Sequence, residues 1–182
     1  MKTSAKRVAL LMGLVLLLNA NLVGTPTDVQ ATANVTVTVD NIMEWAGDFT
    51  DITIATHITA KSSAPVGSGT ATLYTNGDVH ITADITTAAQ LKLGSDPNQI
   101  LLTSYKLTDD GDGTNTTGGT DQGSYTLHGS FLLSSPYAIT HVAGDGADII
   151  TLWAQAENPS GEVADAGDYS AIQTLTASWG NP

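Results

Sequence analysis

The sequence predicts an all-β protein, an antiparallel β-sandwich of the jelly-roll type with about nine or ten strands. Three observations support this fold class: apolar residues alternate with threonine over many short segments, turn sequences separate these segments, and no stretch has sustained helical spacing. Successive side chains of a strand point to opposite faces, so alternation gives one buried and one solvated face. Thr, Val and Ile crowd a helix but fit a pleated sheet. An up-and-down β-barrel is the alternative architecture.

The alternation begins close to the start of the chain. Val35, Val37 and Val39 alternate with threonines, which predicts an amphipathic first strand. Similar patterns predict strands at residues 52–59, 70–75, 79–85, 100–107, 124–133, 137–142, 149–156 and 168–179. One phase of the last segment contains Tyr169, Ala171, Leu175, Ala177 and Trp179.

Turn sequences separate these segments. Asn76-Gly77 supplies the positive φ angles of a two-residue hairpin, so we predict a hairpin that joins residues 70–75 to residues 79–85. Proline-containing turns are predicted at residues 96–98 and 158–161. Because no internal repeat or linker is evident, residues 34–182 are expected to form a single domain.

The first residues resemble a secretory signal peptide. Lys2, Lys6 and Arg7 precede an almost entirely apolar run, residues 8–18. This run is too short to span a bilayer, which disfavours an uncleaved anchor. We expect a signal peptide over residues 1–33, with cleavage nearer residue 20 or 31 as alternatives. The mature protein is then secreted or on the cell surface, with no membrane association.

The charge and composition exclude several classes of function. The 182 residues carry a formal net charge of -12, and after the leader only Lys61, Lys92 and Lys106 are basic. Such a chain cannot neutralise nucleic-acid phosphates, and an anionic membrane surface would repel it. The absence of cysteine excludes disulfides, thiolate metal sites and a cysteine nucleophile. An acidic surface does attract divalent cations.

A glycine-rich acidic segment, residues 108–121, is a candidate Ca²⁺ site. Ca²⁺ takes six to eight oxygen ligands, and glycine allows backbone carbonyls to join them. The segment lacks the Gly and Glu positions of an EF-hand loop, and a solvated hairpin loop is the alternative. A smaller acidic turn, residues 144–148, is a weaker candidate. The expected oxygen ligands in the main segment are Asp109, Asp110, Asp112, Asn115 and Asp121.

The sequence gives little support for catalysis. It contains neither the G-x-S-x-G nor the H-E-x-x-H motif, and Gly67-Ser68-Gly69 is expected to be a flexible turn. The histidines are distributed over separate predicted strands without metal-ligand spacing; they are His57, His80, His128 and His141. We therefore expect no enzymatic activity and no catalytic residues.

Aromatic residues suggest an alternative binding function. Trp45 and Trp179 could form a platform on which a sugar ring stacks, as in a secreted carbohydrate- or surface-ligand-binding module with a structural Ca²⁺. Trp153 lies in a strongly apolar segment and is expected in the core. The competing interpretation is that all large aromatics fill the sandwich.

The layout of the chain resembles a type of filament subunit. A signal peptide is followed at once by the amphipathic segment Ala33-Asn34-Val35-Thr36-Val37-Thr38-Val39, then by a cysteine-free domain rich in Thr and Gly, and finally by residues 168–179. This is similar to secreted β-sandwich subunits that build extracellular filaments by donor-strand exchange, such as TasA-like biofilm fibre proteins and archaeal bundling pilins. The similarity is one of layout, and no specific motif carries it.

The resemblance implies an assembly mechanism with copies of the same chain as partners. The strand released by signal cleavage would insert into a neighbouring subunit, with Val35, Val37 and Val39 filling its pockets. Such head-to-tail contacts do not close, so they propagate into a fibre of a biofilm or surface matrix. The alternative is that residues 34–39 form the first strand of their own sandwich.

Overall fold

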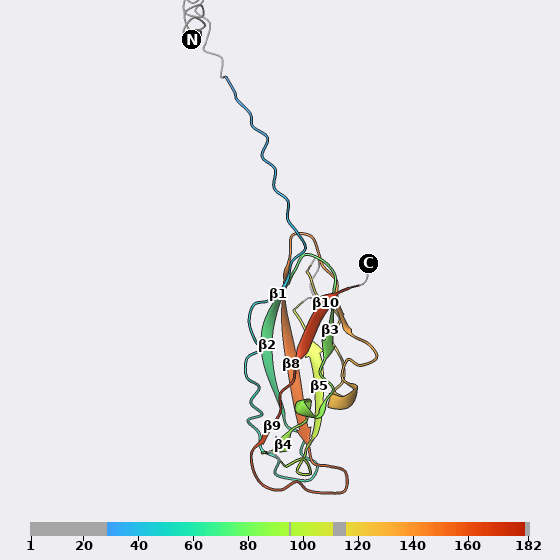
Figure 1. The fold of residues 1–182 in the computed structure, drawn as a ribbon. Coiled ribbons are helices and arrows are strands. Elements are labelled where there is room, and N and C mark those ends of the chain that lie inside the picture. The colour runs from blue at the N-terminus through green and yellow to red at the C-terminus, as the bar shows by residue number, and fades with distance from the viewer. Residues whose placement is uncertain (1–28, 95, 111–115, 181–182) are drawn as a thin grey trace, which may run out of the picture. The chain divides into compact units, whose positions relative to one another are not determined.

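The computed structural model describes residues 29–94, 96–110 and 116–180 (Figure 1). The chain divides into two units, residues 1–38 and residues 39–182. In the first unit, the described residues 29–38 contain no helix or strand. Most of the predicted signal peptide, residues 1–28, lies outside the described residues.

The second unit is all-β, which confirms the predicted fold class. Its larger sheet is antiparallel throughout, with the strand order β1-β2-β8-β5-β6. These strands are β1 (Met43–Trp45), β2 (Val66–Thr75), β8 (Ala147–Glu157), β5 (Leu102–Thr108) and β6 (Thr126–Leu127). The long strands β2 and β8 pair over nine residue positions and form the central part of the sheet.

A second layer covers part of this sheet (Figure 1). It contains a three-stranded antiparallel sheet of order β10-β3-β7, formed by β10 (Leu175–Trp179), β3 (Val79–Ala83) and β7 (Tyr137–Ile139). Four short elements belong to neither of these sheets: the paired strands β4 (Lys92–Leu93) and β9 (Tyr169–Ser170), and the 3₁₀ helices η1 (Thr87–Ala89) and η2 (His128–Ser130). Over the described residues the sheets keep open edges, so the barrel alternative is not observed.

The hydrophobic core lies between the two layers. In β8, residues 148, 150, 152, 154 and 156 are buried while their neighbours are not, as period-two alternation predicts. From the larger sheet, Leu73 and Leu107 also face inward and are fully buried. The second layer contributes Val79, Ile81 and Ile139.

The predicted hairpin at Asn76-Gly77 is wrong. β2 and β3 belong to different sheets, and neither turn residue has a positive φ. The Asn76 side chain instead accepts a hydrogen bond from Ile42 N–H at 2.8 Å and donates one to the Asp40 carbonyl at 2.9 Å. This turn is therefore a corner that passes the chain between layers and anchors the start of the domain.

Gly67-Ser68-Gly69 is part of β2, so the predicted flexible turn is also wrong. A side chain at either glycine would collide with the backbone of Thr53 or Thr50. The two glycines therefore make room for residues 50–53 to cross the inner face of β2.

Two other predicted strands are only partly formed, and two form no strand. Residues 124–133 contain just β6 and η2, and the extended backbone is also interrupted at Leu132, which has a φ of +53°. Residues 168–179 divide into β9 and β10. Four residues of the predicted phase are half-buried, and the fifth, Trp179, is 40% exposed. Residues 52–59 alternate in exposure without strand pairing, and residues 34–39 form no strand.

The two proline-containing turns are confirmed. At residues 96–98, the Asp96 side chain accepts a hydrogen bond from Asn98 N–H, and Leu93 N–H bonds to the Gln99 carbonyl. At residues 158–161, Gly161 has a φ of +79°, and Glu162 N–H closes the turn on the Pro159 carbonyl.

Candidate functional site

The predicted assembly residues lie on an uncharged segment without a strand partner. Residues 29–39 contain no acidic or basic side chain. Val35 is 91% exposed, Val37 87% and Val39 68%. Within the described part of the chain, no hydrogen bond involves the backbone of residues 29–39. The segment therefore keeps an apolar row and a full set of peptide donors and acceptors.

A long groove opens on the inner face of the larger sheet. Its volume is about 940 Å³. Its apolar floor comes from β5, β8 and the residue preceding β5, through Leu101, Tyr105, Leu152, Ala154 and Ala156. The β10-β3-β7 sheet does not contribute to its lining. The floor residues are nevertheless at most 6% exposed, so other parts of the chain cover this region of the larger sheet.

Two extended segments form the walls of this groove, residues 49–58 and residues 163–173. In the first wall, Ile52, Ile54 and Ile58 are half-buried and the residues between them are exposed. No intrachain hydrogen bond is formed by the peptide groups of residues 51–59 among the residues that the structure describes. This wall therefore has the alternation of a strand and the unused backbone groups of a sheet edge.

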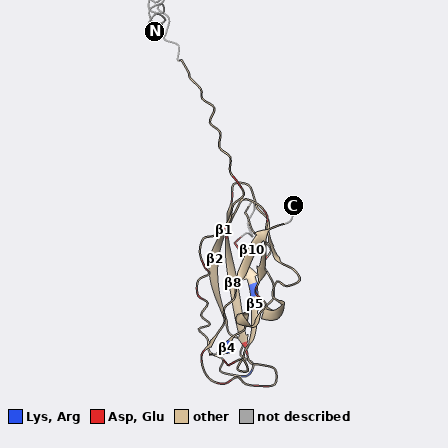
Figure 2. Ribbon diagram, in the orientation of Figure 1, with Lys and Arg blue, Asp and Glu red and all other residues tan. Residues whose placement is uncertain are grey.

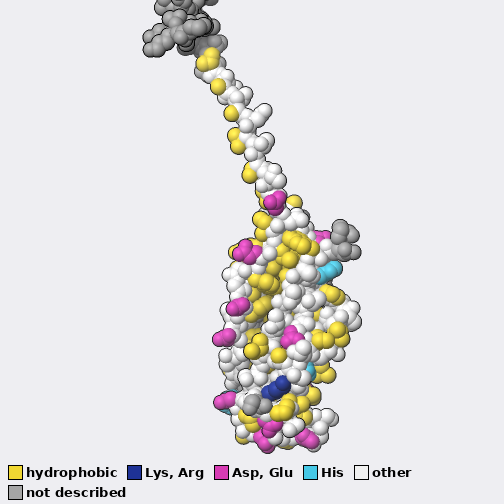
Figure 3. Space-filling view, in the orientation of Figure 1, with side chains coloured by type: hydrophobic (Ala, Val, Ile, Leu, Met, Phe, Trp, Pro, Cys, Tyr) yellow, Lys and Arg dark blue, Asp and Glu magenta, His cyan; other side chains and the backbone are white. Residues whose placement is uncertain are grey.

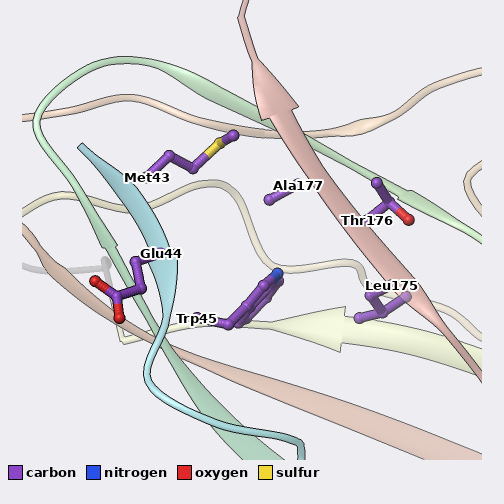
Figure 4. A pocket seen from close by; sticks show the side chains of 6 residues that line it. All are labelled: Met43, Glu44, Trp45, Leu175, Thr176 and Ala177. Atoms are coloured by element: carbon purple, nitrogen blue, oxygen red, sulfur yellow. The ribbon is translucent and has the colours of Figure 1, made fainter. Parts of the chain in front are cut away.

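A smaller pocket of about 240 Å³ lies between the open edges of the two sheets (Figure 4). Met43 and Trp45 of β1 line one side, and Leu175 and Ala177 of β10 line the other. Figure 3 shows apolar side chains gathered on this face of the domain, in the region of β1 and β10. The sandwich is thus less completely closed at this edge.

The acidic segment is partly described, since Asp112 and Asn115 lie outside the described residues. Asp121 accepts a hydrogen bond from Asp109 N–H at 2.9 Å, and Asp109 accepts one from the Tyr137 hydroxyl at 2.7 Å. Asp110 accepts one from Ile149 N–H at 2.8 Å. These bonds tie the start of the segment to β7 and β8, and they tie Asp121 to Asp109. In the smaller turn, Asp145 accepts hydrogen bonds from Thr117 N–H and Ala147 N–H.

The sequence analysis missed the most unusual acid, Asp148. It occupies an inward position of β8, opposite Leu73 of β2, and is fully buried. Among the described residues, no N–H or hydroxyl group donates a hydrogen bond to its carboxylate oxygens, and its side-chain partner is the Asp110 carboxyl. Burial, together with the neighbouring Asp110 and Asp109, raises the pKa of Asp148 to about 9. Its alternation with apolar residues in β8 was the only available indication.

The tryptophans lie in three different environments. Trp45 packs against Phe49, with ring centroids 5.4 Å apart, and Trp179 is 40% exposed beside Gly77. Trp153 is not in the core, contrary to expectation, because it falls in the outward phase of β8. Its indole N–H donates to the Thr108 hydroxyl.

Lys106 lies over the Trp153 ring, 5.3 Å from the centroid, and over the Tyr125 ring at 5.1 Å. Basic residues are otherwise sparse in the domain (Figure 2). Lys106 and the two rings that it covers, Tyr125 and Trp153, are called the outer aromatic cluster of the larger sheet.

Comparison with known proteins adds no relative: no protein-family model matches the chain, and no curated protein matches it. Among residues 29–94, 96–110 and 116–180, no helix has the length and apolar character that a membrane crossing requires. The same residues contain no group of three or more His, Cys, Asp or Glu side chains positioned around a metal ion.

Proposed function

We propose that the protein is a secreted, non-enzymatic subunit of an extracellular filament or surface matrix, and that it polymerises by donating its N-terminal strand. The observation that carries this proposal is the exposed row of Val35, Val37 and Val39 on a segment without a strand partner. An amphipathic extended segment gains most by joining a sheet, because there it buries its apolar row and pairs its peptide groups.

The groove supplies what such a segment lacks. Its floor is apolar, and the unused peptide groups of residues 51–59 lie in one of its walls. The occupant we propose is residues 34–39 of a second copy, which would pair along residues 51–59 and add its valines to the half-buried row of Ile52, Ile54 and Ile58. Each subunit then contains one donor and one acceptor, so addition continues head to tail.

Charge favours this occupant. The formal net charge of the chain is -12, and Asp51, Asp165 and Asp168 line the groove. An acidic segment would be repelled there, whereas residues 29–39 carry no charge.

The valines alone do not account for stable assembly. Burying three valines contributes roughly 4–9 kcal/mol, while association costs about 4–15 kcal/mol in lost freedom. Main-chain pairing along residues 51–59 must therefore contribute to the affinity.

A complementation experiment tests this mechanism. A chain that begins at Asp40 retains the Asn76 anchor but has no donor segment. A peptide of residues 33–39 should bind it with 1:1 stoichiometry and raise its melting temperature. A peptide with Val35, Val37 and Val39 replaced by serine is the matched control. No binding of the native peptide, or equal binding of both peptides, would contradict the proposal.

The outer aromatic cluster supports a second candidate, recognition of a carbohydrate or another surface ligand. Aromatic rings beside a lysine on an outer sheet face can stack on a sugar ring and bond its hydroxyl groups. Ligand-dependent tryptophan fluorescence in a glycan panel, lost in Trp153→Ala, would support this function. The same panel with Trp45→Ala and Trp179→Ala tests the predicted platform, and no response to any glycan would exclude both sites.

A further inference from the structure

Asp148 occupies a position that an ionised side chain could not normally tolerate. In β8 it alternates with Ile150 and Leu152, so its carboxylate points into the sandwich, and it has no exposed surface. A buried carboxylate without hydrogen bonds is strongly destabilising unless a proton or a cation neutralises it. Among the described residues no N–H or hydroxyl group donates to either of its oxygens, and its one side-chain partner is the Asp110 carboxyl, which can bond to it only if one of the two acids is protonated.

A second carboxylate is held beside it. Asp110 follows β5 and accepts a hydrogen bond from the N–H of Ile149, the residue next to Asp148. Asp110 and Asp109 are the acidic neighbours that oppose ionisation of Asp148. Asp109 is itself fixed by the Tyr137 hydroxyl. The end of β5 and the start of β8 therefore bring the exposed Asp110 and the half-buried Asp109 close to the buried Asp148.

The lysines do not neutralise this charge. Lys106, the lysine on the neighbouring strand β5, lies over the aromatic rings of Tyr125 and Trp153 on the outer face of the sheet. Asp148 points to the opposite, inner face. A proton shared with Asp110 and a cation from solution are the two remaining sources of positive charge.

We propose that Asp148 and Asp110 are ligands of a Ca²⁺ ion. An oxygen that accepts one hydrogen bond has a further lone pair, so Asp110 can keep its bond to Ile149 and still coordinate. The described residues contain no cluster of three ligating side chains, so this site would supply two carboxylates. Ca²⁺ can complete its coordination shell with carbonyl oxygens and water. The all-oxygen surroundings favour Ca²⁺, and its flexible geometry suits this arrangement better than the strict octahedron of Mg²⁺.

This site differs from a simple loop site in its chemistry. The essential ligand is a core position of β8 rather than a residue of the glycine-rich segment, so the ion would join β8 to the end of β5. Occupancy should therefore stabilise the whole domain. The proposal does not depend on filament assembly.

Titration of the chain that begins at Ala33 with Ca²⁺ tests the proposal. After EDTA treatment, calorimetry should find one site per chain with a Kd below about 1 mM. Ca²⁺ at a hundredfold excess over Kd should raise the melting temperature by roughly 5–10 °C. Mg²⁺ at the same concentration should have little effect. Absence of binding to the wild-type chain would overturn the proposal.

The variant Asp148→Asn separates a cation from a shared proton. Asn mimics the protonated acid. If the two acids share a proton instead of binding a cation, the variant should be as stable as the wild type, and Ca²⁺ should not stabilise the wild type. A cation site predicts that Ca²⁺ stabilises the wild type but not the variant. Asp48→Asn is the control, because Asp48 is exposed and should retain full Ca²⁺ stabilisation.

Terbium luminescence gives an independent readout. Tyr137 bonds to Asp109 and can sensitise a lanthanide bound beside it. Emission excited through tyrosine should appear on Tb³⁺ binding and fall on addition of Ca²⁺. If Asp148→Asn does not fold, Asp110→Asn decides the question: at least tenfold weaker binding supports the site, and unchanged binding overturns it.

Discussion

Two segments with the same sequence pattern have different positions in this molecule. In residues 34–39 and in β10, apolar side chains recur at every second position. In β10, Leu175 and Ala177 pack against the core and the backbone pairs with β3. In residues 34–39, Val35 and Val37 are exposed and no strand forms. Period-two alternation thus identifies a segment able to pair, but it does not specify the partner.

The largest effect should distinguish these two segments. Leu175→Asp places a charge at a half-buried position against the core and should reduce the free energy of unfolding by about 3–5 kcal/mol. Val37→Asp changes an exposed side chain and should alter it by less than about 0.5 kcal/mol. Urea unfolding at a concentration too low for assembly measures both. Similar losses in the two variants would mean that residues 34–39 belong to their own sandwich.

The inward row of β8 contains a polar residue, and its ionisation gives the next effect. The folded-state pKa of Asp148 is raised to about 9, whereas an unfolded aspartate titrates near 4. Between these values the unfolded state loses its proton first, so stability falls as pH rises. In EDTA, we expect a contribution of roughly 1 kcal/mol per pH unit between pH 5 and 7.5.

Asp148→Asn should remove this contribution while leaving the slopes due to other groups. Urea unfolding at several pH values measures the difference between the two proteins. Parallel pH profiles would contradict the assignment of the slope to Asp148.

Residues 49–58 are intermediate between the two segments. Residues 52–58 alternate in exposure, but Thr50 N–H, which bonds to the Thr70 carbonyl, makes the one backbone hydrogen bond of this range among the described residues. Their path depends on Gly69, where a methyl group would collide with the Thr50 carbonyl. Gly69→Ala should therefore cost about 1–2 kcal/mol, measured by thermal unfolding. Gly123→Ala, where a methyl group meets open space, is the control. An unchanged Gly69→Ala variant would show that this packing contributes little.

The smallest expected effect concerns the outer face of the larger sheet. Lys106→Met keeps the apolar stem but removes the charge above the Trp153 and Tyr125 rings. We expect a loss of about 0.5–1 kcal/mol and a shift in tryptophan fluorescence. Lys92→Met is the control. Lys92 lies in β4, which belongs to a different sheet from both rings, so this substitution should leave the fluorescence unchanged.

The sequence predicted strand capacity better than strand partners. Alternation located β2, β3, β5, β7 and β8, since side-chain burial decides this pattern locally. The pairing at Asn76-Gly77 was misassigned, because a short turn can join strands of one sheet or of two. The role of Gly67 and Gly69 depends on a crossing segment some 15 residues earlier, which no local pattern reveals.

The candidate sites divide in the same way. The exposed valines and the acidic segment were evident from residue types. Asp148 was not, because a single acid among apolar residues acquires its meaning only when β5 and β8 place Asp110 beside it. The groove was equally hidden, since its floor and walls come from four separate parts of the chain.

Negative-stain electron microscopy of the chain that begins at Ala33 tests the donor-strand mechanism most directly. Val37→Lys changes the apolar row, and Thr36→Lys places the same charge on the opposite face of the strand. We predict regular fibres from the wild type and from Thr36→Lys, and monomers from Val37→Lys. A wild-type chain that stays monomeric under all assembly conditions, or a Val37→Lys variant that still forms fibres, would contradict the mechanism.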